Sequence, residues 1–372
     1  MKKYTITVLV LLFNTALFCQ PSYKMIIGTY THSGNSEGIY TFQFNTKDGS
    51  ALPLGKQATP NPSFLISSIN QQIIYSVNEQ ANTGTVTAFK LNTKADSLTQ
   101  LNTVATGGDH PCYLASDRNN RFLFVSNYTG GSFSAIPLKA DGILDTSIQT
   151  IQHIGKSIII GRQESPHVHS TVLSPNEKYL LVQDLGTDKI SVYQVDLNKI
   201  INPIDSSPIH IFNCKPGSGP RHLIFHPTYK LAYAVQELSG AVTVMSFKNG
   251  RLKQIQEISM IPTSSKGKAG AADIHISPDG AFLYASNRGD FNELAIYKIN
   301  KNGTLSHIAT QSTLGKTPRN FAIDPSGKFL LIANQNSNEI VVFDRNKTTG
   351  LISHNGQRIK VGSPICIQFL KN

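Results

Sequence analysis

Short apolar segments alternate with polar turns along most of the chain, and one arrangement of them occurs six times. Each copy has a short apolar segment, a turn often of the Ser-Pro-Asp-Gly type, a second apolar segment and a closing polar pair. The apolar segments are rich in β-branched and aromatic residues, which predicts two strands joined by a turn. The copies are PSFLISSINQQIIYSVNEQ, PCYLASDRNNRFLFVSNYT, VHSTVLSPNEKYLLVQDLG, PRHLIFHPTYKLAYAVQEL, AADIHISPDGAFLYASNRG and PRNFAIDPSGKFLLIANQN.

The spacing of these copies predicts the fold. They begin at residues 62, 111, 168, 220, 271 and 318, and an incomplete copy, PICIQFL, begins at residue 364. Further strand-like segments, such as AVTVMSF and EIVVFDR, follow the polar pairs and bring each repeat to four strands. Repeats of about 50 residues that consist of strands are typical of a β-propeller, in which each repeat forms one small sheet.

The two ends of the chain complete the expected ring. The segment KMIIGTYTHSGNSEGIYTFQFN matches the second and third strands of a repeat and lacks a first strand, whereas PICIQFL is a first strand with nothing after it. We therefore predict an all-β, seven-bladed β-propeller with four antiparallel strands per blade. Its last blade is closed by N- and C-terminal strands, which leaves few sheet edges exposed.

Polar residues stand where the first strand of a repeat begins and where the second strand ends. The first strand of a blade lies nearest the propeller axis and the second runs antiparallel to it, so both positions open on one face. Because consecutive blades are neighbours, we expect His169, Arg221, Glu237 and Arg288 to line one side of the channel mouth. The residues one position after the six repeat starts are Ser63, Cys112, His169, Arg221, Ala272 and Arg319. The residues seventeen positions after the same starts are Glu79, Tyr128, Leu185, Glu237, Arg288 and Gln335.

This set of side chains suits acid–base chemistry on an anionic substrate. A carboxylate or an imidazole can move a proton while guanidinium groups hold negative charge on the substrate or on a developing oxyanion. A structural interpretation is also open, because Arg221 and Glu237 can form an ion pair within one blade and Arg319 can bind a neighbouring carbonyl. His222 occupies a strand position, where local hydrogen bonds can satisfy it.

The remaining polar and thiol residues indicate structural roles. His167 and His169 offer two nitrogen ligands on one extended segment, but no third ligand is evident, and we expect no metal and no cofactor. Cys112, Cys214 and Cys366 lack the spacing of a zinc site or a disulfide framework, so we expect buried thiols. An amide or acid sixteen residues after each start indicates a side-chain bond that closes the turn: Asn78, Asn127, Asp184, Gln236, Asn287 and Asn334.

Composition and charge narrow the class of partner. The chain of 372 residues is 15% charged and carries a formal net charge of +11. Such a balance is compatible with a solvated basic surface or with a small anionic substrate. The sequence contains no run of basic residues and no nucleic-acid-binding motif, so we expect no nucleic-acid partner.

The first twenty residues, MKKYTITVLVLLFNTALFCQ, have the pattern of a secretory signal peptide: two lysines, an apolar stretch and a weak small-residue boundary. The apolar stretch is short for a transmembrane anchor. We therefore predict a signal peptide at residues 1–20, a propeller at 21–372 with no membrane span, and export to the periplasm or the extracellular space.

In this order, the motifs GTYT, GIYTF, PHVHSTVLSPNEKYLLVQDLG, GPRHLIFHP, AYAVQELSG, ADIHISPDGAFLYASNRG and TPRNFAIDPSGKFLLIANQN resemble the propeller-type lactonases over about residues 25–370. That family includes 6-phosphogluconolactonase and a fungal carboxy-muconate lactonizing enzyme. The resemblance implies a metal-independent hydrolase of a small anionic sugar lactone, which converts 6-phospho-D-glucono-1,5-lactone and water to 6-phosphogluconate. It implies catalytic roles for four residues, namely His169, Glu237, Arg221 and Arg288.

Several alternatives stay open at this point. Arg319 and His222 are further candidates for substrate binding. Either Glu237 or His169 can be the base. The chain can also be an exported propeller that only binds a protein or glycan, or an enzyme that cyclises a muconate-like diacid. The sequence does not define an oligomeric state.

Overall fold

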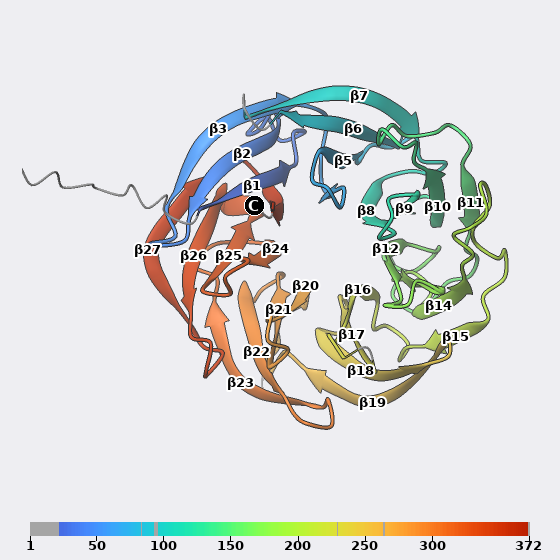
Figure 1. Cartoon of the computed structure of the whole chain (residues 1–372). Helices are drawn as coiled ribbons and strands as arrows, with labels where there is room; N and C mark the ends of the chain where they lie inside the picture. The colour runs from blue at the N-terminus through green and yellow to red at the C-terminus, as the bar shows by residue number, and fades with distance from the viewer. Residues whose placement is uncertain (1–21, 83, 93–95, 229, 263–264, 371–372) are drawn as a thin grey trace, which may run out of the picture.

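Seven small antiparallel sheets stand in a ring around one axis (Figure 1). The structure is a computed structural model and describes residues 22–82, 84–92, 96–228, 230–262 and 265–370. Each sheet has four strands, so the predicted all-β architecture is confirmed. The predicted signal peptide, residues 1–20, lies outside the described residues.

Six blades consist of strands consecutive in sequence. They are β4 (Leu65–Ser67), β5 (Ile73–Asn78), β6 (Thr85–Asn92) and β7 (Ser97–Ala105); β8 (Pro111–Ser116), β9 (Phe122–Asn127), β10 (Ser132–Pro137) and β11 (Gln149–Gln152); β12 (Val168–Leu173), β13 (Tyr179–Asp184), β14 (Lys189–Gln194) and β15 (His210–Asn213); β16 (Pro220–Phe225), β17 (Leu231–Gln236), β18 (Ala241–Lys248) and β19 (Arg251–Ser259); β20 (Ala271–Ile276), β21 (Phe282–Asn287), β22 (Glu293–Ile299) and β23 (Leu305–Ser312); β24 (Pro318–Ile323), β25 (Phe329–Asn334), β26 (Glu339–Arg345) and β27 (Ile352–Lys360).

The seventh blade joins the two ends of the described chain, as predicted. It contains β1 (Ser22–Thr29), β2 (Gly38–Asn45), β3 (Ala51–Ala58) and the C-terminal β28 (Pro364–Phe369) in the order β28-β1-β2-β3. The antiparallel register pairs Ile27 with Ile367 and Gly28 with Cys366. This pairing closes the ring through backbone hydrogen bonds between the N-terminal and C-terminal strands.

Burial explains why the second and the outermost strands of a blade differ in their pattern of apolar and polar residues. Every residue of β5, β9, β21 and β25 is buried, because both faces of these second strands pack against neighbouring blades. The outermost strands are largely exposed instead, as in β19, whose exposed positions include Arg251, Lys253 and Glu257. The apolar core is thus divided into clusters that lie between adjacent blades, such as the one that joins Phe44 of β2 to Phe329 of β25.

A β-bulge near the start of the first strand recurs in several blades and directs side chains toward the axis. The register skips one residue between Pro111 and Tyr113, Val168 and Ser170, Pro220 and His222, and Pro318 and Asn320. Bulges re-aim the extra residue away from the regular alternation of a strand. The residues placed in this way are Cys112, His169, Arg221 and Arg319.

The amide or acid that ends each second strand is buried, and most of these side chains bind backbone, although the expected turn-closing bond is only part of their role. Asp184 does accept hydrogen bonds from the backbone of Gly186 and Thr187, two and three residues later. Most equivalents instead hold the segment that enters the blade: Asn127 binds Thr106 O, Asn287 binds Gly270 N and Asn334 binds Thr313 O. A purely local pattern could not reveal this longer-range contact.

The helical content of the described residues is one short 3-10 helix, η1 (Gln335–Ser337). None of the helices in these ranges is long and apolar enough to cross a membrane. The three described cysteines are buried and free, as predicted.

Candidate active site

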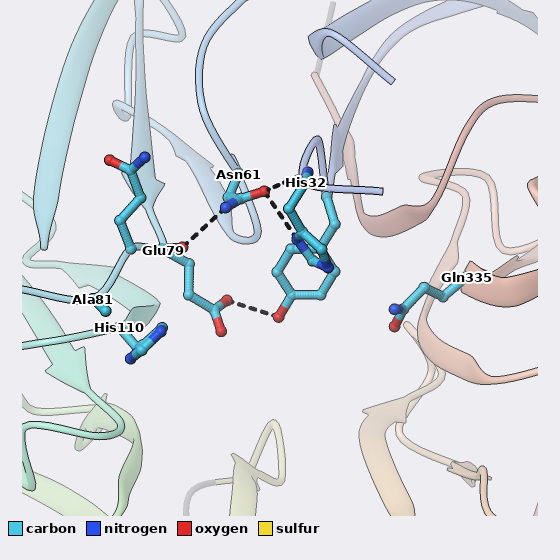
Figure 2. A pocket seen from close by; sticks show the side chains of 8 residues that line it. His32, Asn61, Glu79, Ala81, His110 and Gln335 are labelled. Carbon is cyan, nitrogen blue, oxygen red and sulfur yellow. Dashed lines mark hydrogen bonds between the residues drawn. The ribbon is translucent and has the colours of Figure 1, made fainter. Parts of the chain in front are cut away.

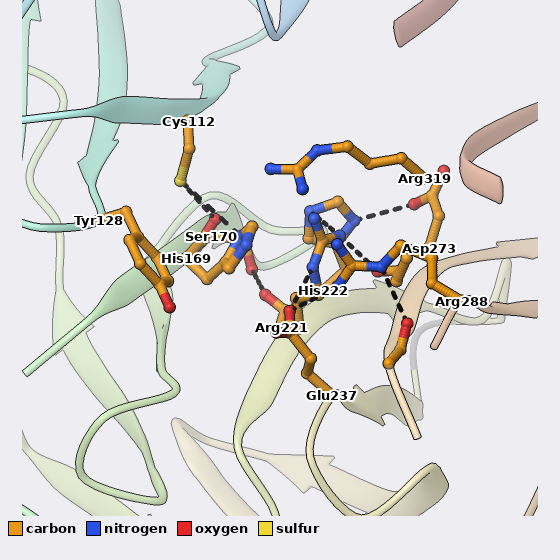
Figure 3. Close-up of polar contacts among 12 residues, drawn as sticks. Cys112, Tyr128, His169, Ser170, Arg221, His222, Glu237, Asp273, Arg288 and Arg319 are labelled. Carbon is orange, nitrogen blue, oxygen red and sulfur yellow. Dashed lines mark hydrogen bonds and ion pairs between the residues drawn. The ribbon is translucent and has the colours of Figure 1, made fainter. Parts of the chain in front are cut away.

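Glu237 lies at the centre of a cluster of guanidinium groups on the face where the bulges open (Figure 3). Its Oε2 atom is 2.9 Å from Arg221 Nε and 2.9 Å from Arg288 Nη2. Its Oε1 atom is 2.5 Å from Nη2 of Arg162. The carboxylate is therefore bound by three cations and is itself buried, at 6% exposure.

Two adjacent blades and one loop supply this cluster. Arg221 stands on the bulge of β16, Glu237 follows β17 in the same blade, and Arg288 follows β21 in the next. The sequence register correctly predicted that these three would meet. Arg162 comes from the long loop between β11 and β12, which lies outside the repeat, so the repeat register did not predict its position.

The charges hold Glu237 in its ionised form. Burial alone would raise its pKa, but the guanidinium groups of Arg288, Arg221 and Arg162 hold that pKa far below its usual range. Burial in turn lowers the pKa of Arg288 to about 10, although Glu237 acts in the opposite direction. A carboxylate stabilised so strongly as an anion is a weak proton acceptor, because protonation would sacrifice its ion pairs.

His169 is the fourth predicted residue and lies close to this cluster. It is 4% exposed, and its ring packs edge-on against the rings of Tyr128 and His222, with centroids 5.2 and 5.4 Å away. Its Nδ1 atom lies 3.7 Å from Cys112 Sγ. Burial, and then the positive charge of Arg221, lowers the pKa of His169 well below 6.5, so the imidazole is neutral at pH 7.

His222 connects Arg221 to a buried aspartate below the cluster. Arg221 Nη1 is 3.2 Å from His222 Nε2, and His222 Nδ1 is 2.9 Å from Asp273 Oδ1. Burial lowers the pKa of His222 to about 4. A neutral ring between a donor and a carboxylate must carry its proton on Nδ1 and accept at Nε2. A role for His222 in substrate binding stays a prediction, since protein groups engage both ring nitrogens here.

Asp273 also binds His275, whose Nε2 lies 3.0 Å from Oδ2, and Asn320, whose Nδ2 lies 2.5 Å from the same oxygen. Burial alone would raise the pKa of Asp273, but His275 and His222 hold it far below its usual range. Burial alone would lower the pKa of His275, but Asp273 raises it. Asp273 was not among the residues predicted for the site, and its partners come from its own strand and from the two adjacent blades.

We expect Asp273→Asn to reduce kcat/KM of the activity proposed below by about 10-fold or more, through displacement of Arg221. The single amide oxygen cannot accept hydrogen bonds from both histidines in this geometry, so the amide NH2 favours the other His222 tautomer, which sets an N–H against Arg221. Steady-state kinetics and the thermal unfolding midpoint measure the two effects. Asp117→Asn changes another buried aspartate, one that binds backbone N–H groups outside the site, and is the control for lost stability.

Arg319 reaches the same mouth from the bulge of β24. Its Nη2 atom donates to the Tyr30 hydroxyl at 3.0 Å, and that hydroxyl donates to Glu79 Oε2 at 2.9 Å. Tyr30 follows β1 and so comes from the composite blade, where the repeat register assigned no site residue. Glu79 occupies a register position expected at the mouth.

Taken together, four guanidinium groups and the carboxylates of Glu237 and Glu79 lie near the neutral imidazole of His169, while the neutral His222 connects Arg221 to the carboxylate of Asp273. The surplus of buried positive charge favours an anion or a developing oxyanion, and the imidazole can accept a proton. His167, the other half of the HVH motif, instead stacks on Tyr128 with ring centroids 4.6 Å apart. In the ranges that the structure describes, no three His, Cys, Asp or Glu side chains are grouped to hold a metal ion.

Comparisons with known proteins agree with this architecture. A family model described as a seven-bladed β-propeller lactonase matches residues 24–369. The chain is 40% identical over 350 residues to a 6-phosphogluconolactonase of Formosa agariphila, which covers 93% of this chain and 99% of that protein. It is 34% identical to a 6-phosphogluconolactonase of Bacillus subtilis, with coverage of 92% and 97%.

A solved structure also matches this chain over almost its whole length. The periplasmic gluconolactonase of Pseudomonas aeruginosa superposes with a TM-score of 0.90 at 38% identity, over 94% of this chain and 99% of that one. Matches of this extent cover all seven blades and the residues of the cluster. The chain therefore belongs to the seven-bladed β-propeller lactonase family.

Proposed function

We propose that this protein hydrolyses the ester bond of a sugar lactone, as a lactonase of the 6-phosphogluconolactonase type. The observation that carries the proposal is the neutral, buried His169 beside an excess of buried guanidinium groups at one mouth of the propeller. Ester hydrolysis needs a proton acceptor for the attacking water and positive charge for the oxyanion, and this arrangement supplies both. The relatives named 6-phosphogluconolactonase support the same reaction.

His169 is the better candidate for the base. It accepts a proton from water as the water oxygen attacks the ring carbonyl. The tetrahedral oxyanion then collapses, the bond between the carbonyl carbon and the ring oxygen breaks, and the imidazolium returns its proton to that oxygen. The product is the open-chain acid. Among the described residues no hydrogen-bond partner engages Nε2 of His169, so this nitrogen is available for the transfer.

The arginines act on charge in this scheme. Arg221 and Arg288 stabilise the oxyanion, and Arg319 is a further contact for negative charge. Glu237, which the sequence analysis left open as the base, instead fixes the guanidinium groups, because its ion pairs oppose protonation. The preorganised cations then require little rearrangement when charge develops.

We also propose export of the protein. The signal-like segment at residues 1–20 and the periplasmic location in the name of the Pseudomonas aeruginosa relative support this. Mass spectrometry of the mature N-terminus in the periplasmic fraction tests it. A chain that retains Met1 in the cytoplasm would contradict export.

The activity is tested by acid release near pH 7 from glucono-1,5-lactone and 6-phosphoglucono-1,5-lactone, with spontaneous hydrolysis subtracted. We expect enzyme-dependent release proportional to protein concentration with at least one of the two. Binding of either sugar acid without any rate above the spontaneous one would indicate a binding protein instead. Loss of the ultraviolet absorbance of a muconate would indicate a cyclising enzyme.

A further inference from the structure

A large polar cavity lies beside the arginine cluster, over the composite blade and its neighbours (Figure 2). Its volume is about 640 Å³, within the range typical of small-molecule sites. Glu79 also lines a narrower cavity together with Arg221, Arg319 and Cys112. The two cavities therefore share Glu79 in their linings. Eight residues line the larger cavity, among them Tyr30, Asn61, Glu79, Gln80, His110 and Gln335.

Glu79 is held in place by its neighbours. Its Oε2 atom accepts a hydrogen bond from the buried Tyr30 hydroxyl, and its backbone carbonyl accepts one from Asn61 Nδ2 at 3.2 Å. Burial raises the pKa of Tyr30, which keeps the phenol a neutral donor. The link from Glu79 to Arg319 passes through this hydroxyl rather than through a direct ion pair in the described structure. Glu79 thus presents a carboxylate to the cavity with one oxygen already positioned.

The lining suits hydroxyl groups more than phosphate. Carboxylate and amide oxygens accept hydrogen bonds from hydroxyls, and the side-chain amides of Gln80 and Gln335 can also donate. Nδ1 of His110 has no hydrogen-bond partner among the described residues. The eight lining residues include neither Lys nor Arg, the side chains that usually bind a phosphate. A phosphate dianion here would face the Glu79 carboxylate.

This arrangement orients a substrate, given the lactonase activity proposed above. A lactone whose carbonyl lies near His169 and Arg221 extends its remaining carbons toward Glu79. We propose that Glu79, positioned by Tyr30, is a specificity-determining residue that binds hydroxyl groups at the end of the lactone distal to the carbonyl and disfavours a phosphate there. The protein therefore hydrolyses the unphosphorylated lactone at least as well as the phosphorylated one.

The test is the ratio of kcat/KM for 6-phosphoglucono-1,5-lactone to that for glucono-1,5-lactone in the Glu79→Gln variant. This substitution removes the charge and keeps the size and hydrogen-bonding capacity. We expect the ratio to rise by about 10-fold, because like-charge repulsion at this position is lost. Added salt should raise the ratio in the wild type and change it less in the variant.

A second variant addresses the chance that Glu79→Gln fails to fold. Gln335→Glu adds a carboxylate on another wall of the same cavity, in η1, and should lower the ratio. Thermal unfolding of both variants verifies that they are folded. His307→Gln, on the exposed outer strand β23, is the control and should leave the ratio unchanged.

The outcomes separate this proposal from the one it depends on. If the wild type hydrolyses at least one lactone but the ratio of kcat/KM values is unchanged in the folded variants, the proposed role of Glu79 is wrong. The proposed lactonase activity then still stands. A wild type that strongly prefers the phosphorylated lactone also overturns the role of Glu79. If the wild type hydrolyses neither lactone, both proposals fail.

Discussion

Replacement of His169 by Gln is expected to lower kcat for lactone hydrolysis by about 10²- to 10⁴-fold, the usual contribution of a general base. Glutamine fills similar space and can hydrogen-bond, but it cannot accept a proton from water at neutral pH. The oxyanion contacts remain, so some activity above the spontaneous rate should persist. Stopped-flow or indicator assays of acid release measure the loss, and His307→Gln is the matched control on the outer surface.

The pH profile gives a second readout on His169. Its pKa lies well below 6.5 because of burial and the nearby Arg221 charge, so the base is already unprotonated at pH 6.5. The wild-type rate should therefore show no inflection near the ordinary histidine pKa of about 6.5 and should fall only in more acidic solution. A His169→Gln variant with the wild-type rate and profile would exclude this residue as the base.

Glu237→Gln is expected to cost about 3–5 kcal/mol of unfolding free energy and to lower kcat/KM by about 10²-fold or more. The substitution leaves Arg162, Arg221 and Arg288 with no carboxylate between them. Like charges in a buried region then repel, and the guanidinium groups leave the positions from which they face an oxyanion. Urea unfolding and steady-state kinetics on the same preparation measure both losses.

The control for this variant is Glu37→Gln. Glu37 pairs with Lys56 on the surface, where 60% of its side chain is exposed, and its removal should change stability little. Full activity in a destabilised Glu237→Gln protein would mean that the ion pairs serve only the fold. An unchanged unfolding midpoint would mean that the arginines need no buried counter-charge.

The same ion pairs predict a pH dependence of stability. The pKa of Glu237 is lower in the folded state than in the unfolded chain, so its stabilising contribution is fully present above the unfolded value of about 4.3. That contribution decreases as the pH falls below this value, because the unfolded state then binds more protons. The stability of Glu237→Gln should depend less on pH in this acidic range than that of the wild type.

The repeat register predicted more of the site than residue types alone could have done. It placed Arg221, Glu237 and Arg288 together because equivalent positions of successive blades share one face, and these three form the observed ion pairs. The same logic placed Arg319 and Glu79 at that mouth. It could not assign Glu237 its charge state, which depends on the number of cations that reach it.

Residues outside the repeat pattern were missed for the same reason. Arg162 belongs to an insertion, so it has no equivalent in the repeat from which its position follows. Tyr30 follows a second strand as Glu237 does, but the first strand of its blade lies at the other end of the chain, so a count from each first strand did not reach it. Asp273 lies on a first strand, but its partners His222 and Asn320 come from the two adjacent blades. Contacts of this kind appear only when the ring is assembled.

The sequence by itself determined the number of blades, the closure of the ring and the face on which polar side chains gather. Those properties follow from strand periodicity and from the length of the repeat, and both can be read from the sequence without knowledge of tertiary contacts. Only the tertiary structure decided which of the gathered groups are free to react. Burial and neighbouring charge set proton affinity, and both depend on side chains that other blades and a non-repeating loop bring within a few ångströms.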